Sequence, residues 1–229
     1  MISQGDVISY LEMCQIEGVN LQRGMNYQLQ SNYSVILMSL RRNAPYADRI
    51  EENGQILIYE GHDIPKIKGI DDPKKFDQPM HNPSGSLTQN GKFYNAALNY
   101  RKGIRKPEIV KVFEKIYSGI WVYNGYFKLI NSWIEKSDNR KVFKFKLAIL
   151  IQANSQKFKK EIEHNRLIPS KIKLEVWKRD KGQCVICGAK DNLHFDHIIP
   201  YSKGGSSTDS ENIQILCSRH NLEKRDKIK

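Results

Sequence analysis

Apolar runs rich in β-forming residues recur along the first 150 residues of the chain. Glycine, asparagine, aspartate and proline separate these runs, which cover residues 33–39, 56–59, 109–113, 120–130 and 142–151. Side chains of the first kind favour strands, and the separating residues favour turns. Because the connections are irregular and some are long, the pattern predicts short strands in a mostly antiparallel sheet or barrel over residues 1–150.

The longest connection runs from residue 71 to residue 91 and contains three prolines, so we expect no regular element within it. A loop this long inside a compact domain is more often functional than decorative. Residues 93–100 are typical of a short helix that follows the loop.

Residues 153–168 are polar and helix-prone, and Pro169 ends them. We therefore predict a helical linker over residues 153–170. Ser170 is a candidate cap for a helix over residues 171–180, with Leu174 and Trp177 on one face.

The chain then changes to a compact series of short elements. A strand is expected near residues 193–199, a loop rich in glycine and serine at 203–210, a strand near 212–216 and a helix from about residue 218. The C-terminal region therefore has the predicted order strand, loop, strand, helix.

The same region carries four candidate metal ligands in a Cys-x2-Cys…Cys-x2-His arrangement, namely Cys184, Cys187, Cys217 and His220. This spacing is typical of a tetrahedral zinc site. A module of about fifty residues buries too little surface to be stable without such a link. Cysteines scattered through a core are the alternative, but they would not explain two pairs with the same spacing. Structural zinc is therefore the predicted cofactor.

Harder ligands lie beside these four. Asp196 and Asn221 offer oxygen atoms, which suit a hard ion such as magnesium or manganese. His197 follows Asp196 directly, and an imidazole of ordinary pKa can accept a proton from water near neutral pH. A histidine beside a hard-metal ligand is what a phosphodiester hydrolase needs.

The composition indicates a polyanionic partner. The 229 residues carry a formal net charge of +12 with a pI of about 9.4, and 39% of them are hydrophobic, which permits a real core. The charge is spread over both parts of the chain and favours nucleic acid, although a generally basic soluble protein is the alternative. We find no membrane-span pattern and no signal-peptide pattern, and the cysteine spacing fits a reducing, bacterial-type cytoplasm.

The run CVICG…LHFDHIIPYSKGGSSTDSENIQILCSRHN resembles the HNH nuclease family over about residues 175–229. The resemblance implies a ββα-metal core and specific roles for the residues in its motifs. Asp196 and Asn221 would hold the catalytic divalent ion, and His197 would be the general base. Asn212 would fasten the loop and orient the histidine. The last motif position, which is histidine in some members, is Asn221 here.

The first 150 residues resemble the SRA (SET- and RING-associated) fold. The resemblance is carried by YSVILMS, Tyr46 with Asp48, ILIYEG, NGKFYNAALN, VYNGYFKLINSWIE and KVFKFKLAIL. It implies a PUA-like barrel with flanking helices that flips a modified cytosine out of DNA. Tyr46 and Tyr59 would sandwich the base and Asp48 would read its edge, unless both tyrosines are simply core residues of two strands. The family's signature aspartate is replaced by Asn124.

Together these features predict an α+β protein with an SRA-like reader at residues 1–152, a linker at 153–170 and a zinc-stabilised HNH nuclease at 171–229. The expected function is a modification-dependent endonuclease acting on double-stranded DNA that contains 5-methylcytosine or a related base. One HNH centre cuts one strand, so a homodimer or two molecules meeting on DNA is expected. The alternatives are a conventional restriction enzyme that reads unmodified DNA, a mobile-element nuclease and a non-catalytic DNA-binding module.

Overall fold

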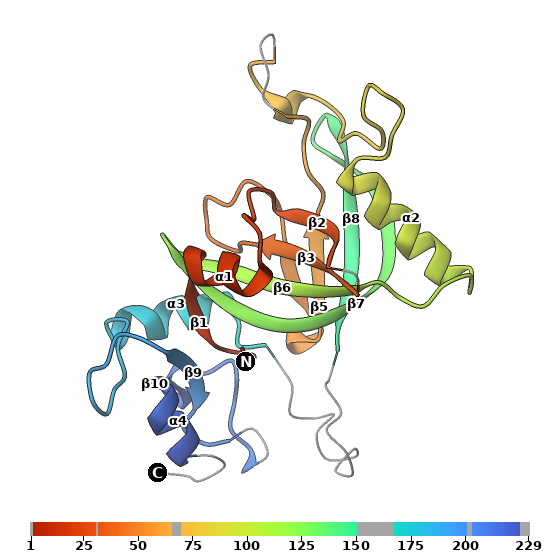
Figure 1. Ribbon diagram of the computed structural model, residues 1–229. Coiled ribbons are helices and arrows are strands. Elements are labelled where there is room, and N and C mark those ends of the chain that lie inside the picture. Colours follow the sequence, from red (N-terminus) through yellow and green to blue (C-terminus); the bar gives the residue numbers. More distant parts are fainter. Residues whose placement is uncertain (1, 31, 66–69, 151–166, 201–202, 225–229) are drawn as a thin grey trace.

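The computed structural model describes residues 2–30, 32–65, 70–150, 167–200 and 203–224. A large curved sheet forms the N-terminal part of the chain, and a small two-stranded hairpin with helices forms the C-terminal part (Figure 1). The predicted α+β class, dominated by sheet, is confirmed. Of the described helices, none is long and apolar enough to cross a membrane.

The large sheet has eight strands, of which seven follow the order β2-β3-β6-β7-β8-β5-β4 and β1 pairs with β7. All pairs are antiparallel except β3 with β6, which are parallel. The strands are β1 (Val7–Ser9), β2 (Met25–Gln30), β3 (Tyr33–Met38), β4 (Arg49–Glu51), β5 (Ile56–Glu60), β6 (Ile109–Tyr117), β7 (Ile120–Ser137) and β8 (Arg140–Ile149).

Strand β7 is the central strand of this sheet, because its first half pairs with β1 and β6 and its second half pairs with β8. It is longer than the predicted run 120–130. Its extension, NSWIEKS, is largely polar and continues beyond a register shift between Leu129 and Asn131. The strand bends with β8 around the core (Figure 1).

Two helices cover opposite faces of the sheet. These are α1 (Tyr10–Glu17), which begins with a capping box between Ser9 and Glu12, and α2 (Gln89–Arg101), which Thr88 caps. Neighbouring side chains of β3 point to opposite faces, so Val35 packs in a cluster with Met13 of α1 whereas Ile36 packs in a cluster with Phe93 of α2. Helix α2 begins at Gln89, which is four residues before the start of the predicted helix at residues 93–100.

Residues 70–88 contain only a short 3-10 turn, η2 (Pro73–Lys75), and an isolated bridge between His81 and Leu87. The prediction of no regular element is confirmed up to the start of α2. A second 3-10 turn, η1 (Glu52–Gly54), joins β4 to β5.

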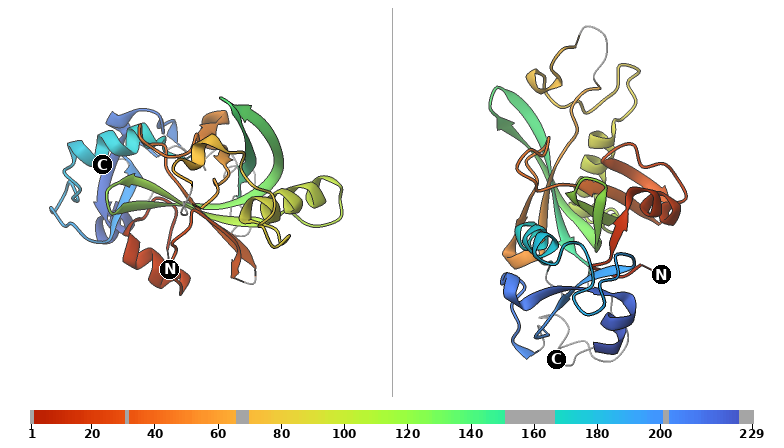
Figure 2. Two further views of the ribbon diagram at one scale, coloured as in Figure 1. Left: turned by 90° about the horizontal axis from the view of Figure 1, so that it is seen from above. Right: turned by 90° about the vertical axis from the view of Figure 1, so that its left-hand side faces the viewer.

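The C-terminal part consists of α3 (Ser170–Arg179), β9 (Leu193–His197), the 3-10 turn η4 (Ser210–Asn212), β10 (Ile213–Cys217) and α4 (Ser218–Lys224). The two strands form an antiparallel hairpin, and α4 packs on it. The predicted order of elements is confirmed. Helix α3 lies between the large sheet and this hairpin (Figure 2).

Two details of the linker region differ from the sequence prediction, namely residues 167–169 and the role of Ser170. Residues 153–166 lie outside the described part of the chain, and residues 167–169 are not helical. Ser170 is the first residue of α3 rather than its cap, and its hydroxyl donates to Glu114 instead. The buried face of α3 carries Ile172, Lys173 and Val176, whereas Leu174 and Trp177 are only half-buried.

The two parts of the chain share a core and a buried ion pair. Ile116 of β6 and Val122 of β7 belong to the same apolar cluster as Val176 of α3 and the β9–β10 hairpin. Beside this cluster, Lys173 of α3 donates to Glu114 of β6 at 2.6 Å, and both side chains are buried. The C-terminal part therefore completes its core with residues of the large sheet.

The N-terminal segment joins the two sheets through its backbone. Gly5 donates to the carbonyl of Tyr123 in β7 at 2.9 Å, and its own carbonyl accepts from Phe195 of β9 at 3.2 Å. Gly5 has φ +95°, and a Cβ there would lie 3.0 Å from the His194 ring. The carboxylate of Asp6 contacts His194 Nδ1 at 2.7 Å. His194 is therefore tied to this joint.

Candidate functional site

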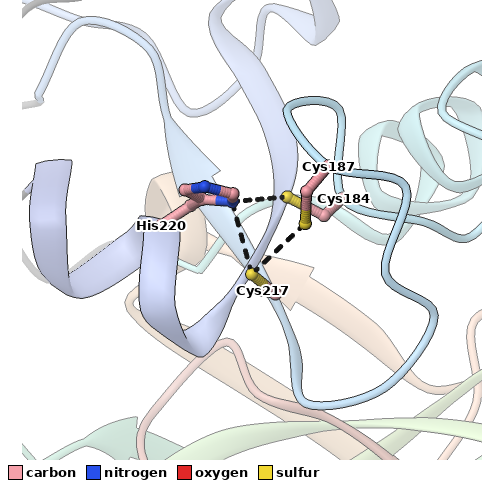
Figure 3. A group of neighbouring side chains, drawn as sticks. All are labelled: Cys184, Cys187, Cys217 and His220. Carbon is pink, nitrogen blue, oxygen red and sulfur yellow. Dashed lines mark hydrogen bonds between the residues drawn. The ribbon is translucent and has the colours of Figure 1, made fainter.

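The four predicted zinc ligands converge on one point (Figure 3). Their ligand atoms all lie within 4.8 Å of one another. Cys187 Sγ is 3.8 Å from Cys217 Sγ, and His220 Nδ1 is 3.3 Å from Cys184 Sγ and 3.4 Å from Cys217 Sγ. A tetrahedral ion with bonds of about 2.3 Å to sulfur and about 2.0 Å to nitrogen would separate its ligands by roughly 3.5 to 3.8 Å. The separations given above are close to these values, so the four residues fit a zinc ion.

The electrostatics of the cluster favour a thiolate. Burial raises the pKa of Cys184, but hydrogen bonds from the backbone N–H groups of Cys217, Cys187 and Ile186 and a contact with His220 outweigh it and lower the pKa to about 6. Thiolate is the form that binds metal. All four cysteines of the chain are free.

Asp196 and His197 lie at the end of β9 and face opposite sides of the hairpin, as alternation along a strand requires. Gln214, directly across the ladder from Asp196, donates to its carboxylate at 3.1 Å. His197 Nε2 contacts the hydroxyl of Ser207 at 2.9 Å, and burial lowers the pKa of His197. The ring is therefore neutral near pH 7 and able to accept a proton.

Asn212 holds the loop that follows β9. Its side-chain oxygen accepts from the Ile199 N–H at 2.8 Å, and its amide donates to the carbonyls of Ile199 at 3.1 Å and Ser206 at 3.0 Å. These bonds fix the segment that presents Ser207 to His197.

Lys224 is a site residue that the sequence analysis missed. It is buried, and its ammonium group lies 2.8 Å from Asp196 Oδ2 and donates to the backbone carbonyl of His197. Asn221 precedes it by three residues on α4, so both side chains leave the helix on the same side. The three-residue spacing of Asn221 and Lys224 in the sequence NLEK could have indicated that Lys224 lies on the same side of the helix as Asn221. Asn221 is half-buried.

The three predicted base-binding residues line one cavity of about 550 Å³ in the N-terminal part. Tyr46 lies in the loop before β4, whereas Tyr59 is a fully buried residue of β5 and belongs to the core as well as to the cavity wall. Asp48 accepts from the N–H groups of Glu60 at 3.0 Å and Ser39 at 3.3 Å, and burial raises its pKa to about 7. His62, which the sequence analysis did not single out, completes the group.

A second cavity, of about 500 Å³, lies between the large sheet and the start of α3. Asp48, Arg41 and Lys115 line both cavities, so the two adjoin. Its other basic residues are Arg42, Arg49 and Lys171. This basic cleft runs from the tyrosine cavity to the start of α3.

Comparison with known proteins gives one family match. Residues 184–227 match the HNH endonuclease family. The C-terminal module is therefore an HNH endonuclease domain, and the predicted class of enzyme, a DNA-cleaving hydrolase, is confirmed. A search of curated proteins finds no significant match.

Several solved structures are similar to this chain. The SRA domain of SUVH5 in complex with hemi-methylated CG DNA is 23% identical, with a TM-score of 0.45, over 69% of this chain and 94% of that one. The same domain bound to fully hydroxymethylated CG DNA is 21% identical, with a TM-score of 0.47, over 69% and 95%. The modification dependent TagI restriction endonuclease is 18% identical, with a TM-score of 0.41, over 96% and 76%.

Proposed function

We propose that this protein is a modification-dependent DNA endonuclease. The N-terminal part, residues 1–152, would accept a flipped 5-methylcytosine or related base, and the HNH module, residues 171–229, would hydrolyse a phosphodiester bond nearby. The observation that carries the proposal is the cavity that holds Tyr46, Asp48 and Tyr59 in the same chain as an HNH domain.

The cavity suits an extruded base. Its volume falls within the range of about 300 to 1,000 Å³ that is usual for small-molecule sites. Tyr46 and Tyr59 supply aromatic faces, and Asp48 supplies a polar group that can pair with the Watson–Crick edge. The adjoining basic cleft, with Arg41, Arg42 and Lys171 along it, would carry the DNA backbone toward the nuclease.

In the nuclease module we assign roles to four residues. The carboxylate of Asp196 and the side-chain oxygen of Asn221 are hard oxygen donors. The donor set therefore fits magnesium or manganese, which would polarise the scissile phosphate and stabilise the leaving oxygen. His197, held by Ser207, would take the proton from the attacking water, and Asn212 would keep the loop in place.

Zinc on Cys184, Cys187, Cys217 and His220 would be structural, because all four positions are filled by protein ligands. It would tie the turn before β9 to the start of α4. The free thiols and thiolate chemistry fit a cytoplasmic protein.

The partner would be double-stranded DNA with modified cytosine. One HNH centre cuts one strand, so we propose that a homodimer, or two molecules meeting on DNA, makes a double-strand break. Reading two modified bases would also multiply the discrimination, because a single methyl group contributes only about 1 kcal/mol.

The test is digestion of two plasmids of identical sequence that differ only in cytosine modification, with magnesium or manganese, by the wild type and by His197→Ala. Cutting of the modified plasmid alone, lost in the variant while zinc and DNA binding remain, supports the proposal. Equal cutting of both plasmids would favour a conventional restriction enzyme. No cutting or nicking of either plasmid would favour a DNA-binding module, and activity of the variant would remove His197 from its role.

A further inference from the structure

His62 contacts both of the tyrosines that are proposed to hold the base. Its imidazole stacks on the Tyr46 ring with centroids 5.3 Å apart and planes 18° apart. At the edge of the imidazole, Nε2 contacts the Tyr59 hydroxyl at 3.0 Å, and the Tyr59 ring is tilted 54° to the imidazole with its centroid 6.2 Å away. A flat ring of a size close to that of a pyrimidine therefore contacts both aromatic side chains, stacked on Tyr46 and in hydrogen-bond contact with the hydroxyl of Tyr59.

The surroundings hold the backbone of His62 in place. The buried side chain of Asn90 on α2 accepts from the His62 N–H at 2.8 Å and donates to the His62 carbonyl at 2.8 Å. At Gly24, a Cβ atom would lie 2.7 Å from His62 Nε2 and 2.8 Å from the Tyr59 hydroxyl. The imidazole thus fits closely against the backbone of Gly24. Burial lowers the pKa of His62 to about 4, so this ring is neutral at working pH.

Tyr46 has a second ring partner. The ammonium group of Lys74 lies 4.5 Å from the Tyr46 centroid and 3.3 Å from Asp63 Oδ2. A base that stacks on Tyr46 must therefore replace either this cation or the imidazole. Of these two partners, the imidazole is the one that also contacts Tyr59, so it occupies the position in which a base would contact both tyrosines.

We propose that the His62 ring is a placeholder for the flipped base, and that a base enters the site by displacing it. This inference rests on the proposed function. Rotation of the side chain about its Cα–Cβ bond would leave both Asn90 hydrogen bonds intact. The cavity of about 550 Å³, which His62 lines, provides space for the displaced ring.

The placeholder reduces the apparent affinity for DNA, because only molecules with a displaced ring can accept the base. The apparent dissociation constant is the intrinsic one divided by the fraction of open molecules. If about 10% of the molecules are open, removal of the ring tightens binding about tenfold. A fixed wall of the pocket would behave in the opposite way, because its removal would weaken binding.

The experiment measures binding of the full chain to two duplexes, one with a single 5-methylcytosine and one with cytosine, without added magnesium or manganese. The variants are His62→Ala and, as a matched control, His81→Ala, whose side chain is exposed on the loop before α2. A 2-aminopurine next to the target base reports base flipping by its fluorescence. The expected result is about tenfold tighter binding of the methylated duplex by His62→Ala, an undiminished flipping signal, and no change for His81→Ala.

Thermal unfolding of each variant shows whether it is folded. Should His62→Ala be unfolded, His62→Ser takes its place, and the imidazole Cε1–H resonance of wild-type His62 gives a second measurement. That resonance should move to the position of a solvent-exposed ring when the methylated duplex binds. Suppose that the wild type prefers the methylated duplex but the variant binds this duplex no more tightly than the wild type does, or that the resonance keeps its buried position. Either result would refute the placeholder role of His62 and leave the proposed function standing. Equal binding of both duplexes by the wild type would overturn the proposed function as well.

Discussion

The buried ion pair between the two parts of the chain allows a quantitative prediction. Lys173→Met removes the ammonium group but keeps a side chain of similar length. Glu114 would then keep only neutral partners, Ser170 and Asn124, for a carboxylate that is fully buried. Removing one member of a buried pair costs about 3 to 5 kcal/mol, since it leaves an uncompensated charge. This is a large fraction of the roughly 5 to 15 kcal/mol by which a domain is usually stable.

The pH dependence follows from the sign of the pKa shift. Burial raises the pKa of Glu114, but the charge of Lys173 and hydrogen bonds from Lys173, Ser170 and Asn124 lower it below the ordinary value. A depressed folded-state pKa contributes stability above the unfolded-state pKa, and this contribution is lost as the pH falls through the folded-state value. In Lys173→Met only burial and the neutral donors remain, so we expect the loss of stability to be larger at pH 7.5 than at pH 5.

Urea unfolding of the full chain, followed by tryptophan fluorescence, is the assay, with Trp177 on α3 itself as one reporter. Lys178→Met, an exposed lysine on the same helix, is the matched control and should cost little. The double variant Glu114→Gln/Lys173→Met should recover much of the loss, because no buried charge is left. A cost below about 1 kcal/mol for Lys173→Met, or an equal cost for the double variant, would refute the reasoning.

Two further predictions concern the zinc site and the base pocket. Cys187→Ser should release zinc and unfold the C-terminal module, which a zinc-binding dye and circular dichroism would show. The control Cys14→Ser should keep the metal. A Cys187→Ser protein that stays folded and retains zinc would contradict the assignment. Asp48 has a folded-state pKa raised to about 7, so its burial lowers stability progressively as the pH rises from about 4 to about 7. The rise of about three units corresponds to at most about 4 kcal/mol, and because Asp48 is half-buried we expect about 2 to 4 kcal/mol. The stability of Asp48→Asn relative to wild type should therefore increase by this amount between pH 4 and pH 8, as measured by thermal unfolding. The exposed Asp71→Asn should show no such increase. Parallel pH profiles of stability for wild type and Asp48→Asn would contradict the raised pKa of Asp48.

The sequence was sufficient for features that depend on local chemistry. The apolar runs gave the five main strands, because each run is rich in residues that fit a half-buried pleated surface. The zinc ligands could be found because a tetrahedral ion needs ligand pairs at fixed short spacing. Asp196 and His197 were likewise visible as neighbours on one strand.

Other features depend on contacts between distant residues. Helix α1 and strand β1 were missed because VIS and YLEMCQIE are short and weakly patterned. The parallel pairing of β3 with β6 has no local signature. Lys173 was not identified as a partner of Glu114, because lysine on a helix is usually solvated and 59 residues separate the two. His62 carried no signal, since only folding stacks it on Tyr46.

The hydrogen bonds of Gly5 to both Tyr123 and Phe195 have a consequence for protein engineering. A chimera that grafts this nuclease onto another DNA-recognition domain cannot be made by a single crossover in the intervening chain. The N-terminal segment around Gly5 would have to be transferred together with β9, and the recipient would need an apolar surface equivalent to Ile116 and Val122. Without both, the transplanted hairpin would lose an edge partner and expose part of its interior.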